Sequence, residues 1–563
     1  MKKKIVSAIL ISSMMLSVTA CGKGGNGGVT NSGELNESTE QTSFTITGGQ
    51  SALSPGYDDN EVLNQMMKDS GIEIEWNTQA NDPNASDDPL KQQVNIQIAS
   101  GDLPDAYMGV GFQNYELSSY GADGTFIDLT PYLTSDVMPN LTAILDEHPE
   151  IKAAITMDDG CIYGLPAGEQ MGTAGIGKAE DYSIFSVPQF SMINKKWLDE
   201  LGLEVPSTLD ELQTALEAFK ENDMAAKTYG APAGSTIPMS TGFDQWCWGQ
   251  NIFYAGFGFT NWINDVCNDL VLNADGKVDF VCDNEEYRDA LTYFSDWYKE
   301  GLIDQEIFSQ DDTQLMAKCQ QGYVGVSTWW YIEELMGDYA EDYVFLPVLT
   351  GPEGTKYEGK SNVTIRTGGG TNSGNLSITS ACESPINLLK FFDKWYEGEN
   401  VMQLQYGPIG VYFKDKDENG VWNSITEEQA KAEYGKGAGE LKGYYEVAGP
   451  KLILSDYYMN TFHMEDRAIE RLTDLYDYWM PQVKDTSVYP IDCVFTSEEL
   501  ETIDTYRTDF ENAVSEQEGL WLKEGGPTDE EWDAYVDMLN NSCGMQELLK
   551  AYQDAYDRYK EAM

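Results

Sequence analysis

The chain has 563 residues, with 35 Lys and Arg against 94 Asp and Glu, which gives a formal net charge of −59. This acidity argues against nucleic acid and anionic lipid surfaces as partners, because both require clustered cations. Aromatic residues make up 12% of the sequence, whereas disordered acidic chains are poor in them, so the chain is expected to fold, into about two to four lobes.

The first residues have the layout of a secretion signal. Three lysines precede an apolar run, Ile5–Val18, which is shorter than the ~20 residues of a membrane span. The small residues before Cys21 are typical of a bacterial lipoprotein box, in which the thiol takes a diacylglycerol. We therefore expect residues 1–20 to be a signal peptide and Cys21 to carry the lipid anchor, palmitate included. Such an anchor is durable, because each CH₂ group buried in the membrane contributes ~0.8 kcal/mol. An ordinary signal peptide with a chance cysteine is the alternative.

The segment after the cysteine has the composition of a linker. Residues 21–43 are rich in Gly, Ser, Thr, Asn and Glu and cannot bury a core, so they are expected to form a flexible tether. The folded body therefore begins near residue 44 and is expected at the extracellular face of the cell membrane.

Strands and helices alternate in the next part of the chain. The patterns predict strands at 43–47, 71–76 and 106–110, and helices at 60–70 and 90–100. This βαβα order is typical of an α/β sheet.

Capping signals mark later helices. Thr208 with Glu211 predicts a helix start, and apolar spacing predicts a second helix over 284–300 that stops at Gly301. Thr496 and Thr528, each followed three residues later by Glu, predict two more starts. The C-terminal part is therefore expected to be helical.

Histidine and cysteine usage argues against common catalytic sites. Only His148 and His463 occur, so a three-histidine zinc site is impossible and His-dependent acid–base catalysis is disfavoured. The cysteines beyond Cys21 are scattered without a Cys-x-x-Cys pair, which excludes zinc and iron–sulfur spacing. We expect mostly free, buried thiols, with a bridge such as Cys267–Cys282 left open.

Two acidic turns imitate metal loops. Asp415–Gly420 resembles the start of a calcium loop, but the twelfth position is Thr426 instead of Glu. Asn419-Gly420 between apolar runs favours a hairpin without metal, with calcium as the less favoured alternative. Asn273–Gly276 is expected to be a second hairpin turn. We expect no cofactor.

Two tryptophan clusters carry the strongest ligand signal. They are Trp246 with Trp248, flanked by Gln250 and Asn251, and Trp329 with Trp330. Sugars present apolar C–H faces that stack on aromatic rings, while their hydroxyls need polar partners. Successive side chains alternate along a strand, so adjacent tryptophans cannot both point into a core. We expect at least one cluster to bind a ligand; packing is the alternative.

A set of segments spread along the chain carries a family resemblance. The segments are Gln97–Asp105, Phe126–Pro131, Gly160–Pro166, Ile193–Gly202, Val205–Asp210, Trp297–Asp304, Gln321–Val326 and Trp532–Tyr559. Together they resemble the solute-binding lipoproteins of carbohydrate-type ABC transporters, the superfamily of maltose-binding protein, in its long lipoprotein branch. No single segment is specific, but the set covers most of residues 44–563.

The resemblance implies an α/β, two-lobed periplasmic-binding-protein-like fold of type 2, with hinge-linked lobes, mixed sheets and a helical C-terminus. The expected lobes are 44–180 with 376–440, and 181–375 with 441–563. The expected crossings lie near Glu169–Ile184, Gly368–Gly374 and Gly435–Gly449, where glycines suit a hinge that must absorb backbone rotation.

The resemblance also implies a ligand cleft between the lobes. The expected ligand-binding residues are Gln50, Tyr107, Gln113, Trp246, Trp248, Gln250, Asn251, Trp329, Trp330 and Tyr406. No catalytic or metal-binding residue is expected. Some relatives carry a calcium loop after the helix near Phe219, but the segment here is Glu221–Lys227, so that site is expected to be lost.

The resulting prediction is a monomeric, membrane-anchored binding protein that captures an oligosaccharide or sugar derivative and delivers it to ABC permease subunits. A protein of the same fold that binds peptides or another polar solute is the alternative. A surface glycosidase is disfavoured, because it needs two carboxylates at a fixed separation and no motif selects such a pair. The chain is therefore not expected to be an enzyme.

Overall fold

The structure is a computed structural model. It describes residues 36–80, 89–157, 159–180, 182–187, 189–243, 247–259, 267, 269–273, 275–355, 375–483, 489–490 and 493–562. The predicted signal peptide, Cys21, Trp246 and the crossing near 368–374 lie outside these residues. The described residues belong to one compact unit, Asn36–Met563. None of their helices combines the length and the apolar character that crossing a membrane requires.

The first sheet has the strand order β11-β3-β1-β2. Strand β1 (Ser43–Gln50) runs parallel to β2 (Glu73–Ala80) and β3 (Ala106–Met108), and β11 (Leu376–Ile378) is antiparallel to β3. The helices α1 (Glu61–Ser70) and α2 (Pro89–Ser100) confirm the predicted alternation. The strand predicted to reach Val110 ends at Met108, because Gly109 takes a left-handed φ of 64°.

The second sheet has the strand order β10-β5-β9-β6. Strand β5 (Phe190–Asn194) is antiparallel to β9 (Val324–Trp329) and to β10 (Tyr343–Phe345), whereas β6 (Ile237–Met239) is parallel to β9. Both sheets are therefore mixed, in agreement with the predicted fold class.

A short parallel pair joins two segments that are far apart in the sequence. Strand β4 (Gly168–Glu169) pairs with β14 (Leu452–Ile453). The Gly168 N–H donates to the Lys451 carbonyl at 2.8 Å, and the Gln170 N–H donates to the Ile453 carbonyl at 2.7 Å. Strand β4 leads into the first expected crossing, Glu169–Ile184, and β14 follows the third, Gly435–Gly449.

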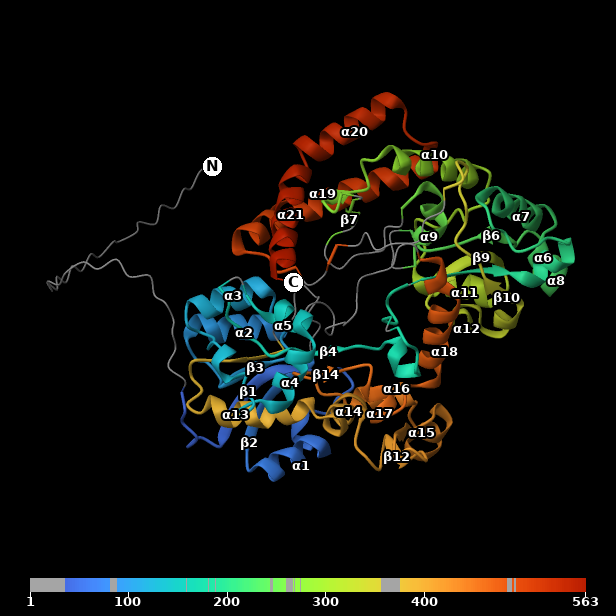
Figure 1. Cartoon of the computed structure of the whole chain (residues 1–563). Helices are drawn as coiled ribbons and strands as arrows, with labels where there is room; N and C mark the ends of the chain where they lie inside the picture. The colour runs from blue at the N-terminus through green and yellow to red at the C-terminus, as the bar shows by residue number, and fades with distance from the viewer. Residues whose placement is uncertain are drawn as a thin grey trace, which may run out of the picture. The chain divides into compact units, whose positions relative to one another are not determined.

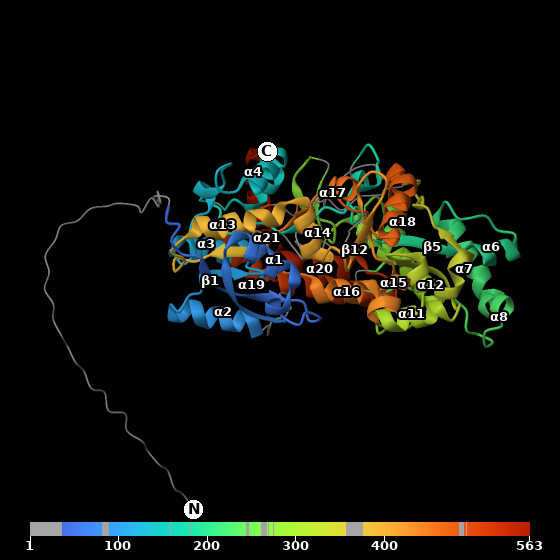
Figure 2. The ribbon, with the colours of Figure 1, turned by 90° about the horizontal axis from the view of Figure 1, so that it is seen from below.

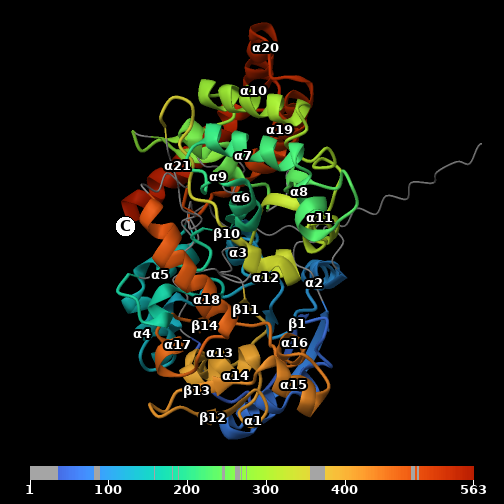
Figure 3. The same ribbon diagram turned by 90° about the vertical axis from the view of Figure 1, so that its right-hand side faces the viewer.

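The remaining elements are mostly helices. They are α3 (Asn114–Ala122), α4 (Pro139–Glu147), α5 (Pro149–Ile155), α6 (Lys195–Leu201), α7 (Leu209–Glu221), α8 (Met224–Tyr229), α9 (Gln250–Phe253), α10 (Glu285–Lys299), α11 (Asp312–Gln320), α12 (Ile332–Met336), α13 (Pro385–Asp393), α14 (Gly398–Tyr406), α15 (Glu427–Tyr434), α16 (Ala438–Tyr445), α17 (Tyr457–Asn460) and α18 (Asp466–Asp474). Figures 2 and 3 both place α13 and α14, from late in the chain, beside α1 and β1 from its start.

The C-terminal part is helical, as predicted. It consists of α19 (Ser497–Glu524), α20 (Asp529–Asn541) and α21 (Met545–Ala562), drawn in red in Figure 1. Thr496 and Thr528 cap α19 and α20 through their side chains, and the glutamate three residues later completes each capping box. The predicted helix starts are therefore confirmed.

Both predicted hairpins form. Strands β7 (Leu270–Leu272) and β8 (Val278–Phe280) make one, and β12 (Phe413–Lys416) and β13 (Trp422–Ser424) make the other. The eight cysteines beyond Cys21 all lie in the described residues; they are free, and all but Cys161 are buried. The prediction of free, buried thiols is therefore confirmed.

Candidate functional site

The carboxyl ends of the parallel strands are the first place to look for a site, because ligands of open α/β sheets bind at that edge. Strands β1 and β3 approach closely there: a Cβ on Gly48 would lie 2.3 Å from the Met108 carbonyl oxygen, so only glycine fits. Gln50 ends β1 and is half-buried. Its Oε1 accepts from the Thr78 hydroxyl at 2.7 Å, which fixes the amide at the edge.

A tyrosine hydroxyl ties this edge to the end of the third expected crossing. The Tyr57 O–H donates to the Gly49 carbonyl at 2.9 Å and accepts from the Ala448 N–H at 2.7 Å. Tyr57 is fully buried, and this burial raises the pKa of its phenol. The end of β1 and the segment that leads into β14 are therefore held together by one neutral hydroxyl.

The Trp329–Trp330 pair is split between the core and a more accessible position. Trp329 ends β9, is 4% exposed and packs in a core cluster with Met192 and Leu335. Trp330 is half-buried, with its ring centroid 5.3 Å from that of Phe185, which is also half-buried. This arrangement follows the alternation of side chains at a strand end.

A buried arginine supports the Trp330 ring. The Arg471 guanidinium carbon lies 3.4 Å from the Trp330 ring centroid and 4.0 Å from that of Phe190. Its Nη1 donates to the Trp330 carbonyl and its Nη2 to the Val187 carbonyl at 2.6 Å. Burial lowers the pKa of Arg471 to about 9, and within the described residues it forms no ion pair. The guanidinium therefore joins α18, the segment before β5, and the end of β9.

The other tryptophan cluster is only partly visible. Trp248 is 4% exposed, stacks on Phe253 with a centroid distance of 4.4 Å, and meets Phe243 edge-on at 4.9 Å. It is therefore a core residue here. Gln250 and Asn251 begin α9, but their side chains, like all of Trp246, lie outside the described part of the chain.

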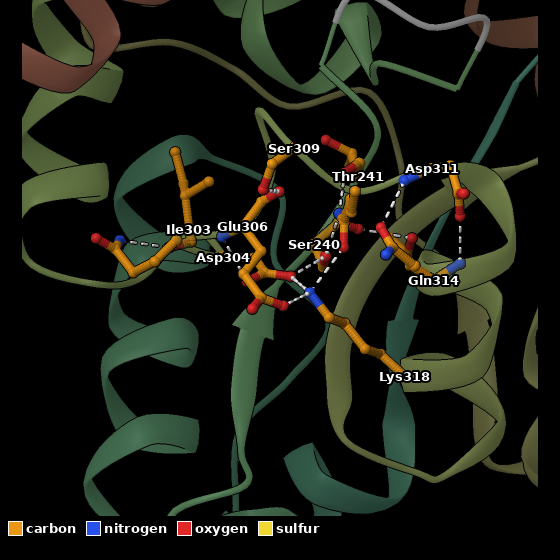
Figure 4. Close-up of polar contacts among 12 residues, drawn as sticks. Ser240, Thr241, Ile303, Asp304, Glu306, Ser309, Asp311, Gln314 and Lys318 are labelled. Atoms are coloured by element: carbon orange, nitrogen blue, oxygen red, sulfur yellow. Dashed lines mark hydrogen bonds and ion pairs between the residues drawn. The ribbon is translucent and has the colours of Figure 1, made fainter.

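A polar network fixes the chain just after β6 (Figure 4). The Ser240 hydroxyl donates to Asp304 Oδ2 at 2.6 Å, and Lys318 Nζ donates to the same oxygen at 2.7 Å. Lys318 also donates to Gln310 Oε1 and pairs with Glu306, both at 2.7 Å. Since its three N–H groups are all engaged, the lysine holds the strand exit that precedes Trp248.

The remaining expected site residues lie in different settings. Tyr107 is fully buried among Phe112 and Phe126, and its hydroxyl has no hydrogen-bond partner in the described residues. Gln113 is exposed at the N-terminus of α3. Tyr406 is 5% exposed and donates to Glu169 at 2.8 Å. The structure thus brings Trp330 next to Phe185 and Arg471, which the sequence did not single out, but places Tyr107 in a core.

The segment Glu221–Lys227, where the resemblance implied a lost calcium loop, is held by protein hydrogen bonds. Asp223 takes a left-handed φ of 46°, and its carboxylate accepts from the Gly234 N–H and the Thr236 hydroxyl, both at 2.7 Å. These bonds, that of Gly234 first, lower the pKa of Asp223. No group of three or more His, Cys, Asp or Glu suited to a metal occurs among the described residues. Both oxygens of the Asp223 carboxylate are therefore engaged by protein donors.

Comparison with known proteins identifies the family. No family model matches the sequence. The chain is 32% identical over 564 residues to the fructooligosaccharide ABC transporter substrate-binding protein FusA of Streptococcus pneumoniae serotype 4, with 98% of each chain covered. The solved structure of FusA in complex with kestose matches with a TM-score of 0.74 at 30% identity, covering 92% of this chain and 100% of that one.

A second solved structure supports the fold. An HMO-binding, ABC-transporter-associated solute-binding protein of Bifidobacterium longum infantis matches with a TM-score of 0.74 at 22% identity, covering 92% of this chain and 99% of that one. The similarity to FusA runs from end to end at more than 30% identity. The chain therefore belongs to the family of solute-binding proteins of carbohydrate ABC transporters.

Proposed function

We propose that this protein captures a fructooligosaccharide outside the membrane and delivers it to the permease of an ABC importer. The observation that carries the proposal is the 32% identity to FusA across 98% of both chains. The match of the described fold to the kestose-bound form of FusA supports the same ligand class. The captured sugar is handed on unchanged, since the relatives are binding proteins of transporters and not enzymes.

The aromatic residues near Trp330 suit a sugar. Trp330 and Phe185 are half-buried rings 5.3 Å apart, and Arg471 holds the indole from one side. Rigid aromatic faces bind apolar C–H surfaces at a low cost in conformational entropy. We propose that Trp330 contacts the ligand, with Gln50, Gln113, Gln250 and Asn251 as candidates for its hydroxyls. A peptide remains the second ligand class to be tested.

The attachment and the hinge complete the proposal. We propose that Cys21 carries the lipid anchor, with residues 22–43 as the tether. The two lobes are proposed to meet at β4 and β14, with boundaries near residues 180, 376 and 440. Such a monomer would close on its ligand by bending at the crossings, as two-lobed binding proteins do.

Binding to a defined panel tests the function. The purified mature chain is titrated calorimetrically with kestose and nystose, and with maltotriose and a tripeptide as controls. We expect one site per chain for the fructans and no heat from the controls. At 100 times its dissociation constant, a ligand should stabilise the protein by about 2.7 kcal/mol, which thermal unfolding detects. Binding of the tripeptide but not of the fructans would refute the proposal.

A further inference from the structure

A glutamate at the first crossing has one carboxylate oxygen saturated and the other free. Glu169 ends β4 and is half-buried. Its Oε1 accepts from the Tyr406 hydroxyl at 2.8 Å and from the Tyr458 hydroxyl. Among the described residues, no hydrogen bond reaches its second oxygen, Oε2. A half-buried acceptor is thus held in place without being satisfied.

The two tyrosines are built to donate. Tyr406 ends α14 and Tyr458 lies in α17; they are 5% and 1% exposed. Burial, followed by the negative charge of Glu169, raises the pKa of both phenols well above 10. Both hydroxyls therefore remain protonated at neutral pH. Two donors converge on Oε1 and hold that oxygen in place, while Oε2 has no protein donor among the described residues.

A buried lysine lies near the same carboxylate. Lys451 is 8% exposed, immediately precedes β14, and donates to the Val447 carbonyl. Burial lowers its pKa, while the charges of Glu446 and Glu169 act in the opposite direction. In the described residues Lys451 makes no ion pair, so its charge is balanced across a distance by these two glutamates. Glu169 thus ends β4, and Lys451 directly precedes β14, the strand that pairs with it.

A purely structural role does not require a carboxylate at this position. An amide oxygen would accept from Tyr406 and Tyr458 as well, without the cost of partly burying a charge. Sugar hydroxyls are good donors, and charged acceptors bind them about twice as strongly as neutral ones do. The free oxygen is what a hydroxyl-rich ligand would use.

We propose that Oε2 of Glu169 accepts a hydrogen bond from a hydroxyl of the bound oligosaccharide, with Tyr406 and Tyr458 as its positioning residues. This inference rests on the proposed function and names a specificity-determining residue for it. Tyr406, expected from the sequence to touch the ligand, then acts through Glu169 instead.

The test compares isosteric variants of the mature protein. Glu169→Gln keeps an acceptor for the phenols but replaces the free acceptor with an amide donor. Glu446→Gln is the matched control: it removes the same charge near the same lysine, and its carboxylate accepts only from Gln405 Nε2, at 3.0 Å, among the described residues. Calorimetric titration with kestose should show binding at least tenfold weaker for Glu169→Gln and within twofold of wild type for Glu446→Gln. The melting temperatures without ligand should agree.

The tyrosines give a second, independent readout. Tyr406→Phe and Tyr458→Phe should each weaken kestose binding three- to tenfold in the wild type, and should have no further effect in the Glu169→Gln background. Additive losses would mean that the phenols bind the sugar directly and would overturn their positioning role. Because each tyrosine is combined with Glu169→Gln separately, the positioning role can still be tested with one tyrosine if the variant of the other folds poorly.

The outcomes separate this inference from the proposed function. If the wild type binds kestose and Glu169→Gln binds it equally well, the inference is wrong and the function stands. If both glutamine variants lose stability and affinity in parallel, Glu169 is a structural residue and the inference is again wrong. If the wild type binds neither kestose nor nystose, the proposed function fails, and the inference fails with it.

Discussion

Trp329 and Trp330 are adjacent in sequence but should respond to truncation in opposite ways. Trp329 is 4% exposed in a core cluster, so Trp329→Ala should cost about 3–5 kcal/mol of unfolding free energy. Its ring lies away from the proposed ligand, so kestose affinity should stay within twofold of wild type, or about 0.4 kcal/mol.

Trp330→Ala should instead act mainly on binding. The ring is half-buried, and the Arg471 guanidinium carbon lies 3.4 Å from its centroid. Losing a desolvated cation–π contact costs about 2 kcal/mol, less than the core truncation. Loss of a stacked sugar should weaken binding at least tenfold, or about 1.4 kcal/mol. Trp330→Phe keeps a ring over Arg471 and should fall between Trp330→Ala and wild type.

Urea unfolding and fluorescence titration with kestose measure the two effects on the same samples. The reasoning is refuted if Trp330→Ala binds kestose as wild type does, or if Trp329→Ala loses more affinity than Trp330→Ala. It is also refuted if both variants lose stability equally, because the pair would then be packing alone.

Three further predictions follow from other features. Arg471→Met should leave the Trp330 and Val187 carbonyls without their donors. Each lost hydrogen bond should lower the free energy of unfolding by about 1–3 kcal/mol, which urea unfolding measures; an unchanged unfolding midpoint would contradict this. Burial, and secondly the charge of Asp279, raises the pKa of Asp283 to about 6. The contribution of Asp283 to folding stability is therefore complete below its unfolded pKa of ~4, and it is lost as the pH rises through 6. Asp283→Asn should therefore be more stable than wild type at pH 7.5 but not at pH 4; a difference independent of pH argues against this assignment. Cys21→Ala should leave the protein unprocessed or shed into the medium, and membrane retention equal to wild type would show that Cys21 is not the anchor.

Local signals in the sequence predicted much of the fold. The capping boxes at Thr496 and Thr528, and the turn at Asn419-Gly420, involve residues within a few positions of one another, so the pattern contains the whole interaction. Strand β3 came out shorter than predicted, because the strand pattern does not reveal that Gly109 is left-handed. Both sheets combine strands from distant segments, and the order of those strands was not predicted, because periodicity within one segment does not say which other segment pairs with it.

The candidate site was less accessible to sequence reasoning. Alternation indicated that adjacent tryptophans would differ, but not which one would be buried. Arg471 lies 141 residues from Trp330 and 284 from Val187, and Glu169 lies 237 from Tyr406. Contacts between residues so far apart in the sequence produce no periodic pattern from which they could be predicted. Tyr107 was expected at the ligand from the resemblance alone, and its ring packs here among phenylalanines.

The buried thiols bear on how this protein survives oxidation. Burial raises the pKa of Cys247 and of Cys382 to about 12, and that of Cys267 and Cys282 well above the usual value. A thiol of pKa 12 is ionised in only about one molecule in 10⁵ at pH 7, and the thiolate is the form that reacts. In the folded chain these four thiols are therefore poor nucleophiles, whereas Cys161 is only half-buried. Before folding the same thiols lack this protection, so the unfolded chain is the form in which they are most open to oxidation and to non-native disulfides.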